Sequence, residues 1–139
     1  MATKSKALPQ PPTIWSAPWH QLKREWMLYH LGDQRLRFLY DKAPVDEWVS
    51  VDCETTGLNP SKDDIISIGA VRIVGNRVLT SEKLQLLVKP TQAISAEAVK
   101  VHGLREQDVA GGLDIDEAMR QLLTFIGPRP LVGYYLEFD

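Results

Sequence analysis

The chain has 139 residues, of which 44% are hydrophobic and 24% are charged, and its formal net charge at pH 7 is −2. This is enough for one domain with a core, and we find neither an apolar run that predicts a membrane span nor a segment typical of a secretory signal. The single cysteine, Cys53, excludes an intramolecular disulfide and a zinc site built on cysteines. The sequence therefore predicts a cytoplasmic protein with no membrane partner.

The charge is distributed unevenly along the chain. Residues 1–42 contain seven Lys and Arg against three Asp and Glu, a net charge of +4, which leaves −6 for the remaining residues. An acidic body does not hold polyphosphate on a broad basic surface, so a nucleic acid would be bound locally, through metal ions and a few donors. The basic N-terminal part either helps to hold a strand or is an ordinary solvated helix face.

Residues 1–44 are expected to form a leader and a helical appendage. Four prolines within residues 1–18 are typical of an extended or disordered leader. Apolar residues at helical spacing then predict an amphipathic helix over residues 19–31, with a further turn at residues 35–40. We expect the apolar stripe of this helix to pack on the body of the protein, and the alternative is a docking face for a partner. The stripe comprises Trp19, Leu22, Trp26 and Tyr29.

The main domain, residues 45–139, begins with a predicted meander of three strands. Residues 49–53 form an apolar run with Val at alternate positions, and the Thr-Thr-Gly that follows soon after predicts a turn. Residues 65–74 and 77–88 are rich in Ile, Val and Leu and are joined by Gly-Asn. Because short connections join neighbouring strands, the three strands are expected to pair antiparallel.

Two helices and a fourth strand are predicted after the meander. The first helix begins at the N-cap Ser95 and ends at Gly103. The second begins at Asp114, where Glu117 three residues later resembles the partner in a capping box. Residues 130–134 form the fourth strand, and a strand-helix-strand crossover favours parallel pairing with the first. The predicted fold class is α/β, a mixed sheet with flanking helices.

Two acids, Asp52 and Glu54, lie one residue apart at the end of the first predicted strand. Successive strand side chains point to opposite faces, so both carboxylates share one face and Cys53 points away, as a buried small hydrophobe. Adjacent carboxylates repel each other unless a proton or a cation lies between them, and Mg²⁺ or Mn²⁺ prefers oxygen ligands. A parallel fourth strand ends at the same sheet edge, which would bring Asp139 to the pair. The alternative is an acidic pair that only solvates the strand edge.

Four ordered segments carry recognisable motifs: residues 51–58 (VDCETTGL), 64–71 (DIISIGAV), 96–104 (AEAVKVHGL) and 131–139 (LVGYYLEFD). Together they resemble the DEDD exonucleases, most closely the branch that includes the proofreading epsilon subunit of bacterial DNA polymerase III. The resemblance implies a ribonuclease H-like fold. It also implies a metal-dependent 3′–5′ exonuclease that releases nucleoside monophosphates from nucleic acid, with DNA as the expected substrate.

The resemblance implies roles for particular residues. Asp52, Glu54 and Asp139 would ligate two divalent metal ions, Mg²⁺ or Mn²⁺, that flank the scissile phosphate, and Asp52 would bridge both ions. The resemblance also places three residues near the terminal nucleotide, namely Thr55, Thr56 and His102.

The substrate residues have plainer alternatives. Thr56 and the glycine after it are equally typical of a turn, and His102 is equally typical of a histidine stabilised by the dipole at a helix C-terminus. Tyr134 and Tyr135 stand where the family commonly has His-Asn, and they either stack on a base or pack at the sheet edge.

The third motif of the family, a His followed five residues later by an Asp, does not occur in residues 1–139. We therefore expect an exonuclease domain without its C-terminal part, in which the general base and the fourth acid are missing and activity is weak or absent. The implied partners are the 3′ end of a single strand and a polymerase or repair protein. The alternative is a non-catalytic binding module that keeps the fold and acts through residues 19–40.

Overall fold

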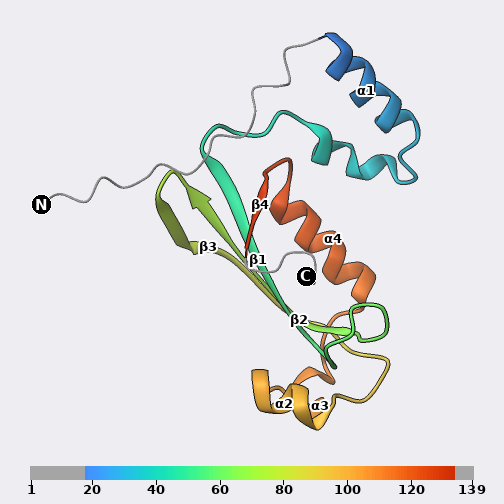
Figure 1. Ribbon diagram of the computed structural model, residues 1–139, viewed down its shortest axis with the longest axis vertical. Coiled ribbons are helices and arrows are strands. Elements are labelled where there is room, and N and C mark those ends of the chain that lie inside the picture. The colour runs from blue at the N-terminus through green and yellow to red at the C-terminus, as the bar shows by residue number, and fades with distance from the viewer. Residues whose placement is uncertain (1–17, 134–139) are drawn as a thin grey trace, which may run out of the picture.

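A computed structural model of the chain describes residues 18–133, which form a four-stranded sheet with helices around it (Figure 1). The strand order is β3-β2-β1-β4. Neighbouring strands are antiparallel except for β4, which is parallel to β1. This arrangement confirms the predicted meander and its parallel fourth strand. The strands are β1 (Glu47–Thr55), β2 (Ile65–Val74), β3 (Arg77–Leu87) and β4 (Leu131–Val132).

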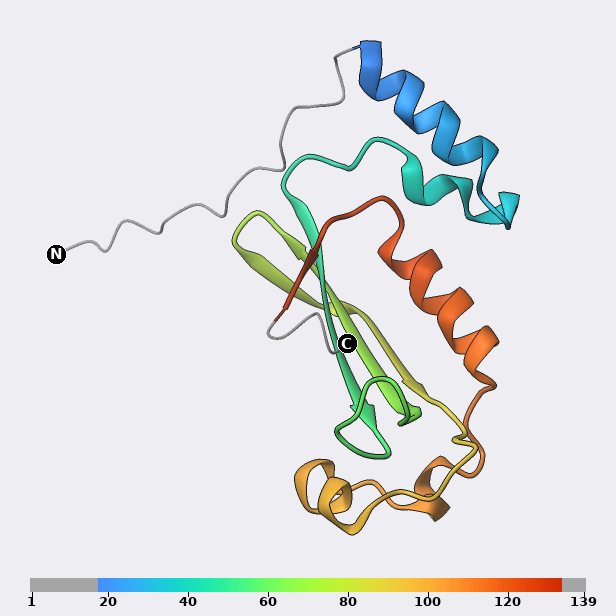
Figure 2. The same ribbon diagram turned by 45° about the vertical axis from the view of Figure 1, so that its right-hand side comes forward.

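The core lies between one face of the sheet and α4 (Ile115–Ile126), which crosses that face (Figure 2). The period of two in β1 buries Val49, Val51 and Cys53 on the α4 side, and the period of 3.6 in α4 buries residues four apart. Apolar burial of this kind contributes roughly 25 cal/mol per Å² to folding. The buried residues that β1 and α4 contribute to this cluster are Val49, Val51, Cys53, Ala118, Leu122 and Ile126.

Strand β4 is short, but three contacts fix its position beside β1. Leu131 and Val132 pair with Val49 and Ser50 in parallel register. The amide of Val49 also donates to the carbonyl of Pro130 at 3.1 Å. Next to this pair, the guanidinium of Arg129 donates to the Glu47 carboxylate at 2.6 Å. The two residues of β4 therefore lie beside the first half of β1 and run in the same direction. The predicted strand residue Tyr134 lies outside the described residues.

The helices after the meander begin and end largely where the sequence predicts. In α2 (Ala96–His102), the Ser95 hydroxyl accepts a hydrogen bond from Ala98 N at 3.1 Å, and Gly103 ends the helix with φ of +78°, a conformation that favours glycine. A short helix, α3 (Glu106–Val109), follows and was not predicted.

The predicted capping box at the start of α4 is wrong. Asp114 is the N-cap, but its carboxylate accepts from the amide of Asp116 at 2.9 Å. The carboxylate of Glu117 interacts with Arg120 and Gln121 along the helix instead. Arg120 and Gln121 lie within about one helical turn of Glu117, so they compete with the backbone amide of Asp114 for its carboxylate.

The appendage is a hairpin of α1 (Pro18–Tyr29) and the 3₁₀ helix η2 (Gln34–Tyr40), and η2 contacts α4. Arg24 ties the two helices together, because its guanidinium donates to the Tyr40 carbonyl at 2.8 Å and to the Asp41 carboxylate at 3.1 Å. The prediction that the apolar stripe packs on the body is wrong: Leu28 is the buried residue of α1, and the stripe faces outward. Trp19, Leu22, Trp26 and Tyr29 are 59%, 73%, 63% and 82% exposed.

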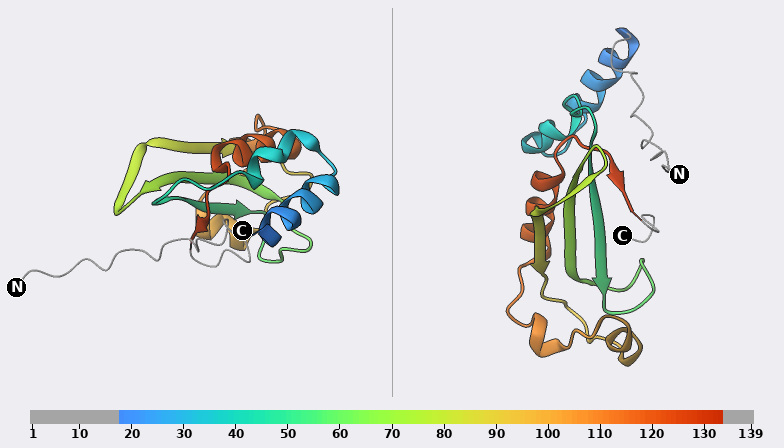
Figure 3. Two further views of the ribbon diagram at one scale, coloured as in Figure 1. Left: turned by 90° about the horizontal axis from the view of Figure 1, so that it is seen from above. Right: turned by 90° about the vertical axis from the view of Figure 1, so that its left-hand side faces the viewer.

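The two groups of peripheral helices lie at opposite ends of the sheet. Figure 3 shows α1 and η2 beyond the start of β1, whereas α2 and α3 lie near its end. The face of the sheet opposite α4 carries no helix of residues 18–133 (Figure 3). None of the described helices is both long and apolar enough to cross a membrane.

Candidate functional site

Asp52 and Glu54 lie on the sheet face opposite α4, close to the end of β1. The neighbouring residues Val51 and Cys53 are buried on the α4 side, whereas Asp52 is exposed and Glu54 is half-exposed. Residues two apart on a strand are separated by about 6.5–7 Å between Cα atoms. The predicted sharing of one face by the two carboxylates is therefore confirmed, as is the burial of Cys53.

The two carboxylates are available as ligands. Within residues 18–133, neither the Asp52 nor the Glu54 side chain forms a hydrogen bond or an ion pair. Two exposed oxygen donors on one face fit a hard divalent ion, because Mg²⁺ and Mn²⁺ favour carboxylate and water ligands. The same residues contain no group of three side chains able to hold a metal ion. Asp139, the third predicted ligand, lies outside the described residues.

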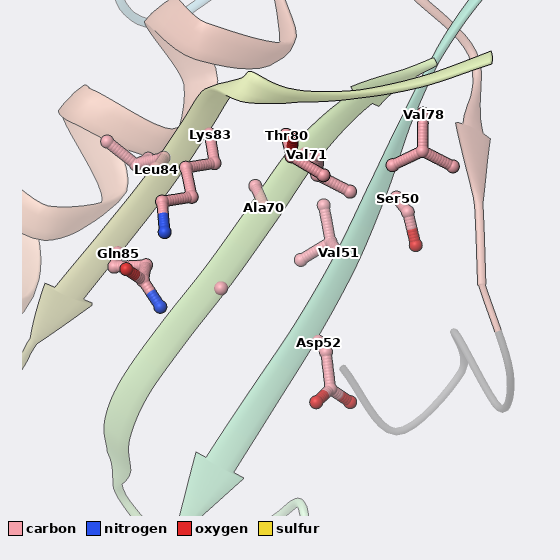
Figure 4. A pocket seen from close by; sticks show the side chains of 11 residues that line it. Ser50, Val51, Asp52, Ala70, Val71, Val78, Thr80, Lys83, Leu84 and Gln85 are labelled. Atoms are coloured by element: carbon pink, nitrogen blue, oxygen red, sulfur yellow. The ribbon is translucent and has the colours of Figure 1, made fainter.

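A cavity of about 370 Å³ adjoins Asp52 on this open face (Figure 4). Gly69 lies directly across from Asp52 in the pairing of β1 with β2, and Gln85 lies across from Gly69 in β3. Figure 4 shows that Lys83 and Gln85 border the cavity from β3. A Cβ at Gly69 would lie 3.7 Å from the backbone carbonyl oxygen of Asp52, an ordinary contact distance, so a small side chain would fit there without a clash.

The loop after the acidic pair is held by Thr56, which is 1% exposed. Its amide donates to the Asp64 carbonyl at 2.9 Å, and its hydroxyl accepts from the Asp64 amide at 2.9 Å. Its carbonyl accepts from the amide of Ser95, the N-cap of α2, at 2.9 Å. The polar groups of Thr56 are thus engaged within the fold and position the loop relative to α2. The pairing of β1 with β2 also shifts register between Glu54 and Thr55, and irregularities of this kind often occur beside active sites.

Asp63 and Asp64, at the end of this loop before β2, accept further hydrogen bonds that hold the loop in place. The Asp63 carboxylate accepts from Asn59 N at 2.7 Å and lies against Gly57, where an added Cβ would come within 2.5 Å of it. The Asp64 carboxylate accepts from the amide and the hydroxyl of Thr91 at 2.7 and 2.8 Å. These two hydrogen bonds lower the pKa of the Asp64 carboxyl below its usual value, and the bond from the Thr91 hydroxyl has the larger effect.

His102 joins α2 to the end of β1. Its Nδ1 accepts from the Leu104 amide at 3.0 Å, and its Nε2 lies 3.2 Å from the carbonyl oxygen of Thr55. An amide can only donate and a carbonyl can only accept, so the two contacts require the neutral tautomer with its proton on Nε2. Both ring nitrogens are therefore occupied, and the Thr55 hydroxyl donates to the Gly57 carbonyl.

One residue beside the acidic pair received no role from its sequence pattern. Leu58 is 77% exposed on the loop that follows β1. The sequence does contain a signal for this residue: a large apolar side chain directly follows a turn glycine, where polar residues are usual. Leu58 is a candidate for contact with an apolar surface such as the face of a nucleobase.

Comparisons with known proteins were made for the sequence and for the fold. A family model described as Exonuclease matches residues 49–139. The chain is 39% identical over 101 residues to the DNA polymerase III subunit epsilon-like protein of Rhodobacter capsulatus, covering 70% of this chain and 14% of that protein. It is 32% identical over 92 residues to DNA polymerase III subunit epsilon of Aquifex aeolicus, covering 66% of this chain and 45% of that protein.

Solved structures of exonucleases have a fold similar to that of this chain. Exonuclease X in complex with 5′ overhanging duplex DNA superimposes with a TM-score of 0.57 and 25% identity, covering 66% of this chain and 51% of that one. A product-bound structure of exonuclease I, at 23% identity and a TM-score of 0.55, covers 65% of this chain and 22% of that one and has the same fold. The mixed sheet with its flanking helices is thus ribonuclease H-like. The chain spans less than half the length of the two named polymerase III relatives.

Proposed function

This chain belongs to the exonuclease family, and we propose that it takes part in metal-dependent removal of nucleotides from the 3′ end of single-stranded nucleic acid, with DNA as the substrate. The observation that carries the proposal is the pair of carboxylates, Asp52 and Glu54, on the open face near the end of β1, which have no side-chain partner among residues 18–133. Support comes from relatives named as polymerase III epsilon subunits and from the similar fold of exonuclease X.

The proposed ligands of two divalent ions, Mg²⁺ or Mn²⁺, are Asp52, Glu54 and Asp139. When bound, such ions supply a nucleophile at neutral pH and stabilise the leaving oxygen of a phosphodiester. Asp52 is exposed and borders the cavity on the open face, so its two oxygens are accessible to more than one ion. Glu54 lies directly before the register shift at the end of β1, next to the loop that Thr56 holds.

The proposed substrate residues act in two ways. We assign Thr55 and His102 to the wall of the site for the terminal nucleotide, because the His102 ring and the Thr55 carbonyl meet beside Glu54. The buried side chain of Thr56 is assigned to the same site through positioning, since its hydroxyl fixes the loop to Asp64. His102 is a poor general base, because both of its ring nitrogens are engaged in hydrogen bonds.

The proposal includes weak or absent activity for a polypeptide of these 139 residues, because they contain no His-x₄-Asp motif to supply a base. The test is release of mononucleotides from single-stranded DNA labelled at either end, with Mn²⁺ present. Ladders that shorten only from the 3′ end establish the direction. Robust turnover by the 139 residues that disappears in Asp52→Ala would show that the base lies within this chain, and the assignment of His102 would then have to be reconsidered.

A polymerase or a repair protein is the proposed partner, and the cytoplasm is the proposed location. A second candidate function is a non-catalytic binding module, and the outward-facing apolar stripe of α1 is the observation that favours it. Metal binding separates the two candidates. Calorimetric titration with Mn²⁺ should give heat of binding that is lost in Asp52→Asn. A chain that binds no Mn²⁺ although its acids are intact would favour the binding module.

A further inference from the structure

Helix α1 has a covered side and an uncovered side, and most of its large apolar side chains lie on the uncovered one. Its covered side carries His20, Arg24 and Leu28, which are four residues apart and less exposed than their neighbours. Its uncovered side carries the stripe defined above, and each member of the stripe is more than half exposed. The rings of Trp19 and Trp26 stack only on His20 and His30 within residues 18–133, at centroid distances of 3.8 and 4.4 Å. A contiguous apolar surface of this kind marks an interaction site.

The spacing of the stripe identifies the type of surface that would cover it. Its members are separated by three, four and three residues, the spacing of the a and d positions in a heptad. A seam with this spacing stays on one side of a helix and fits the matching seam of another helix. The seam spans residues 19–29, and it is self-complementary in size, because each end carries an aromatic ring and its centre carries Leu22 and Trp26.

The exposed area is sufficient for association of two chains. Side chains of this size have about 150–250 Å² of surface each, and the observed exposed fractions therefore leave about 600 Å² per chain in the stripe. Complete burial of the stripe in two copies would remove at most about 1,200 Å² in total from solvent, which is the lower limit for a specific interface. The four-residue stripe alone therefore provides enough surface for a weak dimer.

A single nucleic-acid strand fits the stripe less well than a second helix does. Binding a strand requires cations along the backbone as well as aromatic platforms. Of the two cations in α1, Arg24 is already bound to Glu25 at 3.0 Å, to Asp41 and to the Tyr40 carbonyl. That leaves Lys23 as the cation of α1 beside the stripe.

We propose that the stripe is a dimer interface, in which α1 packs against α1 of a second copy of this chain across a two-fold axis. In an antiparallel pair centred on residue 24, Trp19 lies opposite Tyr29 and Leu22 opposite Trp26, so each large ring faces a residue of the other chain. In this pair Glu25 is the acid closest to the two-fold axis, and its negative charge is balanced by its ion pair with Arg24. Helix α1 lies beyond the start of β1 (Figures 1 and 3), whereas Asp52 and Glu54 lie in the second half of this strand, so the dimer leaves the proposed active site open.

The test is the mass of the full 139-residue chain in solution, measured by sedimentation and by light scattering. Because dimerisation obeys mass action, we expect the average mass to approach twice that of the monomer as concentration rises from about 5 to about 500 μM. In the double variant Leu22→Ser, Trp26→Ser, the dissociation constant should rise at least tenfold. These side chains are exposed, so circular dichroism should show the same fold.

A matched control is the double variant Val78→Ser, Val101→Ser, which removes two other exposed apolar side chains, 56% and 76% exposed. It should dimerise as the unchanged chain does. A single monomeric mass at every concentration, or a dimer that persists in the Leu22, Trp26 variant, overturns the proposal. A monomer that binds labelled oligothymidylate, and loses this binding in the same variant, would also overturn it and would assign the stripe to nucleic acid.

Discussion

The imidazole of His102 lies 3.2 Å from the carbonyl oxygen of Thr55, the residue that directly follows Glu54. This contact connects α2 to the end of β1 over a sequence separation of 47 residues. Because a second bond from Leu104 fixes the ring, the contact limits movement of the strand end that carries the acidic pair. The geometry of the site therefore depends on a helix that contributes no acid.

Replacing His102 with Ala should destabilise the chain by about 1–2 kcal/mol, because it removes two hydrogen bonds and leaves the Leu104 amide without its acceptor. Chemical denaturation at pH 7 measures this change. His30→Ala is the control, since His30 is exposed and bonds only within its own segment. Equal stability of His102→Ala and the unchanged chain would contradict the proposed connection.

Replacing Asp52 with Asn should weaken Mn²⁺ binding at least tenfold without loss of stability in the absence of metal. The reason is that the Asp52 carboxylate has no partner within residues 18–133, so its charge contributes nothing there that a neutral amide would lose. The measurement is the increase in melting temperature with Mn²⁺, which follows ligand affinity. Glu106→Gln, an exposed acid on α3, should keep the full increase. An unchanged increase in Asp52→Asn would remove this residue from the proposed ligands.

The adjacent glycines of the loop before α4 should respond differently to alanine. A Cβ at Gly112 would lie 2.7 Å from the Val88 carbonyl carbon and 2.8 Å from Lys89 N, whereas Gly111 has open space. Because backbone atoms at these distances have to move, Gly112→Ala should lose about 1–3 kcal/mol of stability. Gly111→Ala should be neutral or slightly stabilising, since it restricts the unfolded chain. Urea denaturation of both variants checks the pair, and similar losses would refute the steric explanation.

Asp64 should make stability depend on pH in the acid range. Hydrogen bonds from Thr91 lower the pKa of this carboxyl in the folded state below its usual value. A group with a lowered folded pKa contributes stability that is present above its unfolded pKa, near 4, and is lost as pH falls through the folded value. Thermal unfolding from pH 7 to pH 2 should show this loss. Asp64→Asn should reduce it, and an identical pH profile for the variant would contradict the assignment.

The strands and caps were predictable because their signals are local. Alternating Val in residues 49–53 and the Ser95 and Gly103 pair each specify a conformation within a few residues. The shared face of Asp52 and Glu54 follows directly from the strand period. Helix α3 has only four residues, too few for any periodicity to appear.

The features that sequence reasoning missed depend on contacts between distant residues. The bonds from Arg24 to Tyr40 and Asp41 hold one side of α1 against η2, so the apolar stripe faces outward. Likewise, nothing in the residues around Thr56 indicates that its hydroxyl bonds to Asp64 and its carbonyl to Ser95. The positions of Asp139, Tyr134 and Tyr135 stay predictions, because these residues lie outside the described part of the chain.

The glycine across the sheet from Asp52 has a consequence for how an ion would arrive. Mg²⁺ gives up its water shell reluctantly and usually keeps several waters when a protein binds it. Since Gly69 presents no side chain, the space beside Asp52 admits an ion together with that shell. A branched side chain at position 69 would occupy part of this space, and an ion bound by Asp52 as proposed would then have less room for its waters. The size of this one residue would therefore limit the hydration of a bound ion, separately from the carboxylates proposed to bind it.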